Sequence, residues 1–249
     1  MSRTVVVTGG AKGIGRATAA RFAAAGDRVI ALGRDAPALG ALGAADAVGP
    51  VETHVCDVTD EAAVTATFEQ IGPVDVLVNN AGIGESAPLH QTTLDAWRRH
   101  LDVNATGAFL CMRAVTPGMK ERGAGAIVSV ASTAGRTGVP YTTAYTASKH
   151  AVIGLTRAIA AEYAGTGVRV NAVCPTFVRT EMTNRSIAHI VQRTGRTPQQ
   201  AEEALAQASP LGRLLEPDEV AEAILFLASP GAAAISGQAV VIDGGGIQA

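Results

Sequence analysis

The chain has 249 residues, of which 47% are hydrophobic, 17% are charged and 4% are aromatic, and its net charge is −2. This composition supplies a large buried core and lacks the basic footprint of a nucleic-acid-binding protein. Because no apolar run approaches the roughly 18 residues of a membrane span and no signal peptide is recognisable, we expect a cytoplasmic protein with no membrane partner.

Short β-branched runs alternate with longer amphipathic stretches along the chain. The expected strands cover residues 4–8, 28–32, 51–56, 74–79, 126–131, 168–173 and 239–242. The expected helices cover residues 15–25, 61–71, 94–122, 143–163 and 217–228. Strands that are apolar throughout indicate parallel pairing with both faces buried. The pattern predicts an α/β fold of Rossmann-like type, a doubly wound parallel sheet of about seven strands with helices on both faces, in a single domain over residues 1–249.

Residues 181–215 interrupt this alternation between the sixth expected strand and the last expected helix. Thr197-Pro198 predicts the start of a helix, and Ser209-Pro210 predicts its end. Because this segment follows the carboxyl end of a strand, where ligands bind in such folds, we expect a small helical lid over a substrate. A purely structural insertion is the alternative.

A glycine-rich turn, TGGAKGIG over residues 8–15, joins the first expected strand to the first expected helix. Glycine lets the backbone turn tightly and approach a pyrophosphate, and the N–H groups at the start of the following helix face the anion. The spacing of Gly9, Gly13 and Gly15 differs from the common G-x-G-x-x-G fingerprint. The turn nevertheless predicts a dinucleotide site.

The end of the second expected strand bears on the choice of cofactor. NAD sites usually place a carboxylate there for the ribose hydroxyls, whereas this chain has Gly33 followed by Arg34, with Lys12 as a second cation. An arginine pairs well with a 2′-phosphate. We therefore favour NADP(H) over NAD(H); the alternative is that Arg34 is a solvated charge stacking on the adenine of either cofactor.

Four polar side chains form a candidate catalytic group. Tyr145 and Lys149 are four residues apart and therefore share one helix face. A nearby cation lowers the pKa of a phenol, which is otherwise near 10, toward the working range of an acid/base. Ser132 follows the fifth expected strand, so its hydroxyl can face the same crevice. Asn104 lies inside the long helical stretch 94–122, where we interpret it as marking a backbone kink that holds a proton-relay water; an exposed or locally bonded helix asparagine is the alternative.

Together these motifs resemble the short-chain dehydrogenase/reductase family, in its compact type without an added domain, over residues 4–245. The glycine turn matches TGxxxGIG, residues 79–82 match NNAG, and Asn104, Ser132, Tyr145 and Lys149 match the family's catalytic tetrad. The cofactor-binding residues that we expect are Gly9, Lys12, Gly13, Ile14, Gly15, Arg34, Asp57, Val58, Asn79, Ala81, Gly82, Tyr145, Lys149, Pro175, Val178 and Thr180.

The resemblance also implies individual roles. Asp57 is expected to bond the adenine amino group, Asn79 and Ala81 to shape the cofactor cleft, and Thr180 to hold the carboxamide region. One position departs from the family, because Thr176 follows Pro175 where a glycine is usual. We expect the added side chain to alter local geometry or substrate orientation without abolishing activity.

The implied reaction is hydride transfer between a nicotinamide and a carbonyl or carbinol carbon. In reduction Ser132 hydrogen-bonds the carbonyl oxygen, Tyr145 protonates it, and Lys149 lowers the tyrosine pKa and binds the nicotinamide ribose; none of these roles requires a metal. We expect a 3-oxoacyl thioester reductase, acting on CoA- or carrier-protein-bound substrates and similar to polyketide ketoreductases. The alternatives are a dehydrogenase of a non-thioester secondary alcohol (cyclic, aromatic, sugar or steroid) and an inactive nucleotide-binding scaffold.

Two further expectations concern partners. Arg185, Arg193 and Arg196 in the lid segment could meet a pantetheine or nucleotide phosphate, or remain solvated surface charges. The apolar helices over 94–122 and 143–163 suggest a homotetramer or homodimer, with core packing inside one chain as the alternative.

Overall fold

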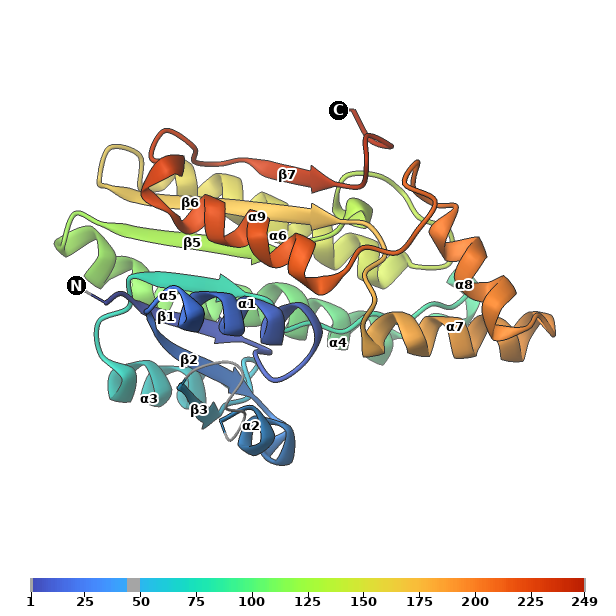
Figure 1. Cartoon of the computed structure of the whole chain (residues 1–249), viewed down its shortest axis with the longest axis horizontal. Helices are drawn as coiled ribbons and strands as arrows, with labels where there is room; N and C mark the ends of the chain where they lie inside the picture. The colour runs from blue at the N-terminus through green and yellow to red at the C-terminus, as the bar shows by residue number, and fades with distance from the viewer. Residues whose placement is uncertain (1, 44–49, 249) are drawn as a thin grey trace.

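Seven parallel strands form the sheet at the centre of the computed structural model, which describes residues 2–43 and 50–248 (Figure 1). The strands are β1 (Thr4–Thr8), β2 (Arg28–Gly33), β3 (Val51–Val55), β4 (Val76–Asn79), β5 (Gly125–Val130), β6 (Val168–Pro175) and β7 (Ala239–Ile242). Their order is β3-β2-β1-β4-β5-β6-β7, so the direction of growth reverses between β1 and β4. This arrangement confirms the expected doubly wound sheet.

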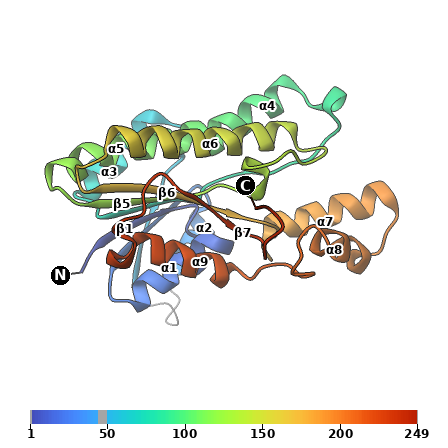
Figure 2. The same ribbon diagram turned by 90° about the horizontal axis from the view of Figure 1, so that it is seen from above.

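Helices cover both faces of the sheet (Figure 2). One face carries α1 (Gly13–Ala24), α2 (Ala36–Gly43) and α9 (Pro217–Ala228). The other carries α3 (Glu61–Ile71), α4 (Leu94–Leu101), α5 (Gly107–Glu121) and α6 (Thr143–Glu162). None of the helices in the described residues is long and apolar enough to cross a lipid bilayer.

The sequence of the central strand β1 is apolar without alternation because both faces of the strand are buried. Val5 and Val7 belong to the core under α1 and α9, whereas Val6 belongs to the core under α3 and α5. All three side chains are fully buried. Burying each one contributes about 1.5–3 kcal/mol, so both faces of the strand stabilise the fold.

The observed elements differ from the expected ones in two places. The stretch 94–122 is not one regular helix, because a π-helical turn at Asp102–Thr106 separates α4 from α5. Helix α2 was not predicted, since its sequence APALGALG combines a proline with two glycines. Its start is fixed by Asp35, whose side chain accepts a hydrogen bond from the Ala38 N–H at 3.0 Å. The other boundaries predicted outside the lid segment lie within two residues of the observed ones. Inside the lid segment, α8 ends at Ala206, three residues before the predicted Ser209.

The lid segment, residues 181–215, contains α7 (Glu181–Thr194) and α8 (Pro198–Ala206), which project beyond the carboxyl edge of the sheet (Figures 1 and 2). The helix predicted at Thr197 is confirmed, with a capping box in which Thr197 and Gln200 bond each other's backbone N–H groups. Arg179, just before α7, pairs with Glu202 of α8 and with Glu216 at the start of α9, both at 3.0 Å. These exposed ion pairs fasten the base of the lid segment.

Candidate active site

The carboxyl ends of the parallel strands gather the predicted site residues at one edge of the sheet. The glycine turn follows β1, Arg34 follows β2, and Asp57 lies two residues beyond β3. Asn79 ends β4, and Ser132 lies two residues beyond β5. Because doubly wound sheets bind ligands where the strand order reverses, the region above β1 and β4 is the candidate active site.

The glycine turn has the geometry of an anion cradle. A Cβ on Gly15 would lie 2.2 Å from the Gly9 carbonyl oxygen, so a side chain there would displace the turn. Gly9 and Gly13 have φ values of +63° and +51°, which favour glycine. Helix α1 begins after Lys12 without a capping side chain among the described residues, which leaves its first N–H groups for a ligand. The turn therefore fits the pyrophosphate of a dinucleotide.

Asn80 closes this turn against β4. Its side-chain amide donates to the carbonyl oxygens of Thr8 at 3.0 Å and Gly9 at 3.1 Å. The Thr8 hydroxyl in return accepts from the backbone N–H groups of Asn80 and Ala81, each at 3.0 Å. Sequence reasoning chose Asn79 and Ala81 from the NNAG stretch and missed Asn80, although the doubled asparagine was a signal that two different amide roles were needed.

The predicted cofactor residue Asn79 has an unusual surrounding. Its side chain is 5% exposed, and neither atom of its amide has a hydrogen-bond partner among the described residues. The adjacent residue across the ladder, Ser129, also has an unpartnered buried hydroxyl. A buried polar group without a partner costs about 1–3 kcal/mol. This amide therefore fits a site where a ligand or an ordered water supplies the missing bonds.

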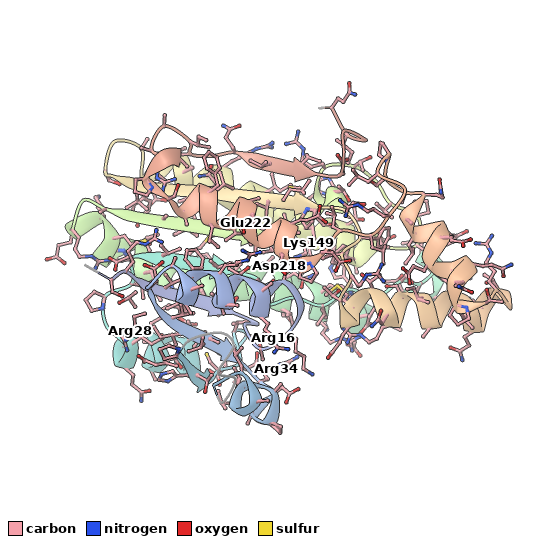
Figure 3. All side chains as sticks on the ribbon, viewed as in Figure 1. Arg16, Arg28, Arg34, Lys149, Asp218 and Glu222 are labelled. Atoms are coloured by element: carbon pink, nitrogen blue, oxygen red, sulfur yellow. The ribbon has the colours of Figure 1, made fainter. Side chains whose placement is uncertain are left out.

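The two cations assigned to a 2′-phosphate both carry carboxylate partners. Lys12 Nζ lies 2.9 Å from Asp35 and 3.5 Å from Glu181, the first residue of α7. Arg34 lies 3.4 Å from Asp57, which was itself expected to bond adenine. Figure 3 shows Arg34 beside α2.

The pKa of Asp57 depends on the groups around its carboxylate. Burial opposes ionisation of this carboxyl, but hydrogen bonds from the Thr59 backbone N–H and hydroxyl, together with the neighbouring Arg34 guanidinium, outweigh burial and lower its pKa. Those two bonds, at 2.9 and 2.8 Å, engage the Oδ1 oxygen. Asp57 is therefore a fixed acceptor at neutral pH.

The structure brings Ser132, Tyr145 and Lys149 together. Tyr145 and Lys149 lie on α6, and Lys149 Nζ is 5.7 Å from the centre of the Tyr145 ring. The Ser132 hydroxyl lies close enough to the Tyr145 phenol to lower the pKa of the tyrosine. Lys149 is 5% exposed and donates to the Val130 carbonyl oxygen at 2.7 Å. In Figure 3 Lys149 lies toward the carboxyl ends of the central strands.

Burial has the largest effect on the ionisation of Tyr145. It raises the pKa of the phenol, and the nearby Ser132 hydroxyl opposes this rise. Burial also lowers the pKa of Lys149 to about 8. The ammonium therefore remains mostly protonated at neutral pH, and a positive charge this close to the phenol favours the phenolate.

Asn104 lies in the π-helical turn and is 2% exposed. Its Oδ1 accepts from the Ile83 N–H at 2.8 Å, and its Nδ2 donates to the Ile83 carbonyl oxygen at 2.9 Å and to Ser148 Oγ at 2.8 Å. The expected distortion of the helix is present, and the alternative of an exposed or locally bonded asparagine is wrong. The amide joins three segments of the site: the loop after β4, the π-helical turn and α6.

His100 is a site residue that sequence reasoning missed. It is 2% exposed, its Nδ1 donates to the Ala96 carbonyl oxygen at 2.7 Å, and its Nε2 accepts from the Glu85 N–H at 3.1 Å. Its ring meets that of Tyr145 edge to face at 6.5 Å. Its position one helical turn before Asn104 was the available signal. Asn104 and His100 thus hold the loop 83–85 beside Tyr145.

The lid segment closes the other side of Tyr145. A Cβ on Gly84 would lie 3.0 Å from Met182 Sδ and 3.4 Å from Tyr145 Cε2. The hydroxyl of Ser86 hydrogen-bonds His189 Nδ1 of α7 at 3.2 Å. The loop after β4 and α7 therefore approach each other over Tyr145.

The remaining predicted residues lie where β6 leads into the lid segment. Thr180 caps α7, and its methyl group would meet a Cβ on Gly13 at 3.0 Å, so the lid segment rests on the glycine turn. Val178 forms a short parallel bridge with Leu215. Thr176 N–H donates to the Ile242 carbonyl oxygen at 3.1 Å, which continues the β6–β7 pairing. The backbone therefore accommodates threonine there without leaving the sheet.

Comparison with known proteins agrees with this geometry. A family model described as Enoyl-(Acyl carrier protein) reductase matches residues 9–246. The chain is 42% identical to the 2-(R)-hydroxypropyl-CoM dehydrogenase of Xanthobacter autotrophicus, with 98% of each chain covered. It is 40% identical to the D-threitol dehydrogenase of Mycolicibacterium smegmatis, covering 98% of this chain and 92% of that one. A solved structure of actinorhodin polyketide ketoreductase with NADPH superimposes with a TM-score of 0.92 at 38% identity, covering 98% and 97% of the two chains.

Proposed function

The chain belongs to the short-chain dehydrogenase/reductase family, and from this premise we propose that it interconverts 3-oxoacyl and 3-hydroxyacyl thioesters with NADP(H). Membership makes the protein an NAD(P)-dependent oxidoreductase that acts on small-molecule ketones and secondary alcohols. The scaffold alternative is therefore set aside. The single observation that carries the proposed chemistry is that Ser132, which follows β5, and Tyr145 and Lys149 of α6 gather at the carboxyl edge of the sheet.

The chain's own residues position the substrate and move one proton. In reduction the Ser132 hydroxyl donates a hydrogen bond to the carbonyl oxygen, and the Tyr145 phenol gives that oxygen its proton. Lys149, protonated below about pH 8, stabilises the phenolate that remains and hydrogen-bonds the nicotinamide ribose. The bound nicotinamide supplies or accepts the hydride.

Separate groups are proposed to hold the cofactor. The glycine turn and the first N–H groups of α1 bind the pyrophosphate. Lys12 and Arg34 bind the 2′-phosphate, and this choice of NADP(H) is supported by the two cations and by a neighbouring structure that contains NADPH. Asp57, Asn79 and Thr180 contact the adenine, the cleft wall and the carboxamide region.

The role of Tyr145 has a direct test. Tyr145→Phe removes the proton donor while keeping the ring, so turnover should fall by at least about 10²-fold, the typical contribution of a general acid. Absorbance at 340 nm measures turnover, and calorimetric titration of NADP⁺ should give a dissociation constant close to that of the wild type. Tyr163→Phe, just past the end of α6, is the matched control and should retain activity. Retained turnover in Tyr145→Phe would refute the assignment of Tyr145 as the proton donor.

The substrate class needs its own experiment. Similarity to a polyketide ketoreductase supports a 3-oxoacyl thioester. The exposed Arg185, Arg193 and Arg196 of the lid segment add positive charge that suits a phosphate of the carrier. The relative named for D-threitol favours a second candidate, the dehydrogenation of a non-thioester secondary alcohol. Acetoacetyl-CoA should react with a higher kcat/KM than cyclic ketones, steroid ketones or sugar alcohols. A higher kcat/KM for any of these latter compounds would favour the second candidate.

Assembly as a homotetramer or homodimer forms part of the proposal. Helix α5 presents Phe109, 40% exposed, on the outside of the sheet's α3–α6 face, and Arg113 lies over its ring. An exposed aromatic of this kind suits an interface between subunits. The mass in solution, measured by light scattering, should exceed that of one chain.

A further inference from the structure

The ion pair between Lys12 and Asp35 has a consequence for cofactor selectivity. Lys12 belongs to the glycine turn, and Asp35 lies two residues beyond the end of β2. Their charged atoms are 2.9 Å apart. A 2′-phosphate that binds Lys12 must therefore compete with a carboxylate that is already there.

Asp35 is fixed in this position by the fold. One of its oxygens accepts from the Ala38 N–H at 3.0 Å and so starts α2, while the other oxygen faces Lys12. Helix α2 is in turn anchored by Leu39 and Leu42, both 2% exposed. The carboxylate cannot leave Lys12 freely without giving up the start of a packed helix.

The second carboxylate near Lys12 is less constrained. Glu181 is 3.5 Å from Lys12, and its side chain is more exposed than that of Asp35. The hydrogen bond that Lys12 donates to Asp35 is also the largest cause of the raised pKa of Lys12. Asp35 is therefore the principal competitor for this ammonium.

We propose that Asp35 is a selectivity-determining residue that holds Lys12 and so reduces the preference of the site for NADP(H) over NAD(H). This inference rests on the proposed binding of a 2′-phosphate by Lys12 and Arg34. Asp35 both neutralises a cation that the phosphate needs and repels the phosphate directly. Both effects are weaker for NAD(H), because its ribose carries no 2′-phosphate.

The test uses Asp35→Asn, because asparagine is as good an N-cap as aspartate and should preserve α2. Calorimetry measures the dissociation constants of 2′,5′-ADP and 5′-AMP, which differ by the 2′-phosphate. The ratio of the two affinities should shift toward 2′,5′-ADP by about three- to tenfold, as expected for an interaction between exposed charges. The same direction is expected for NADP⁺ against NAD⁺.

Two controls isolate the mechanism. Glu52→Gln removes another exposed, ion-paired carboxylate, the partner of Arg28, and changes the net charge equally. Its affinity ratio should stay near that of the wild type; an equal shift would overturn the inference, because it would show a general field effect. In a Lys12→Gln background, Asp35→Asn should shift the ratio less than it does in the wild type, and an undiminished shift would overturn the claim that Asp35 acts by holding Lys12.

Arg34→Gln separates this inference from the proposed function. If Arg34→Gln weakens 2′,5′-ADP binding while Asp35→Asn leaves the ratio unchanged, the inference fails and the NADP(H) assignment stands. If neither Arg34→Gln nor Lys12→Gln weakens 2′,5′-ADP binding, the assignment fails and the inference fails with it. Melting temperatures of all variants verify that each one is folded.

Discussion

The buried ammonium of Lys149 should destabilise the folded protein at neutral pH. Its side chain is 5% exposed, and burial lowers its pKa from the ordinary 10.5 to about 8. Lys149→Met keeps the length of the side chain and removes the charge. The difference between the two pKa values corresponds to about 3 kcal/mol of destabilisation by the charged form. The hydrogen bond to Val130 that methionine loses is worth about 1 kcal/mol, so the variant should be more stable than the wild type by about 2 kcal/mol at neutral pH.

The lowered pKa of Lys149 also determines how the free energy of unfolding changes with pH. Between about pH 8 and pH 10.5 the unfolded chain binds a proton at Lys149 that the folded protein does not bind. The free energy of unfolding of the wild type therefore rises with pH across this window. Below about pH 8 the full cost of the buried charge is present, and above pH 10.5 it disappears.

Denaturant unfolding of the wild type and Lys149→Met measures this directly, at one protein concentration because assembly affects apparent stability. From about pH 7.5 to pH 9.5, the wild type should gain about 2 kcal/mol relative to the variant. The variant should also lose turnover at every pH. Unfolding curves that shift with pH in parallel for the two proteins would refute the reasoning, because they would show that Lys149 has the same pKa in the folded and unfolded chains.

Two further changes test the frame of the site. Asn104→Ala removes three hydrogen bonds to Ile83 and Ser148. This loss should lower the free energy of unfolding by about 3 kcal/mol and the melting temperature by about 6–12 °C. A calorimetric scan in which the variant melts at the same temperature as the wild type would contradict this. Gly15→Ala places a methyl group 2.2 Å from the Gly9 carbonyl oxygen, so titration should show cofactor affinity reduced by about tenfold or more, equivalent to 1.4 kcal/mol. Gly40→Ala in α2, whose added methyl group meets open space, is its control and should bind cofactor as the wild type does.

The sheet could be predicted because burial on both faces leaves a simple apolar pattern in the sequence of its strands. Val5, Val6 and Val7 are apolar without alternation, and only a strand covered on both faces requires this. The helix start at Thr197 was equally readable, since its cap depends on residues three apart in the chain. Such features depend on local sequence, and the structure confirms them within a residue or two.

The parts that escaped prediction depend on residues distant in sequence. The carboxylate next to Lys12 is 23 residues away in the chain at Asp35, and only the pairing of β1 with β2 brings the two together. His100 gives no motif of its own, because its importance comes from Glu85 and Tyr145. The effect of burial on the pKa of Tyr145 escaped prediction for the same reason: the helical spacing to Lys149 was visible, whereas the degree of burial was not.

The lid segment is attached to the rest of the molecule by exposed ion pairs and by few buried side chains. Its helices bury few side chains, Thr183 in α7 and Ala201 and Ala206 in α8, and Arg179 ties its base with two exposed ion pairs. Raising the salt concentration weakens exposed ion pairs of this kind, whereas it does not weaken the apolar packing of the sheet. We therefore expect added salt to loosen the attachment of α7 and α8 before it affects the core.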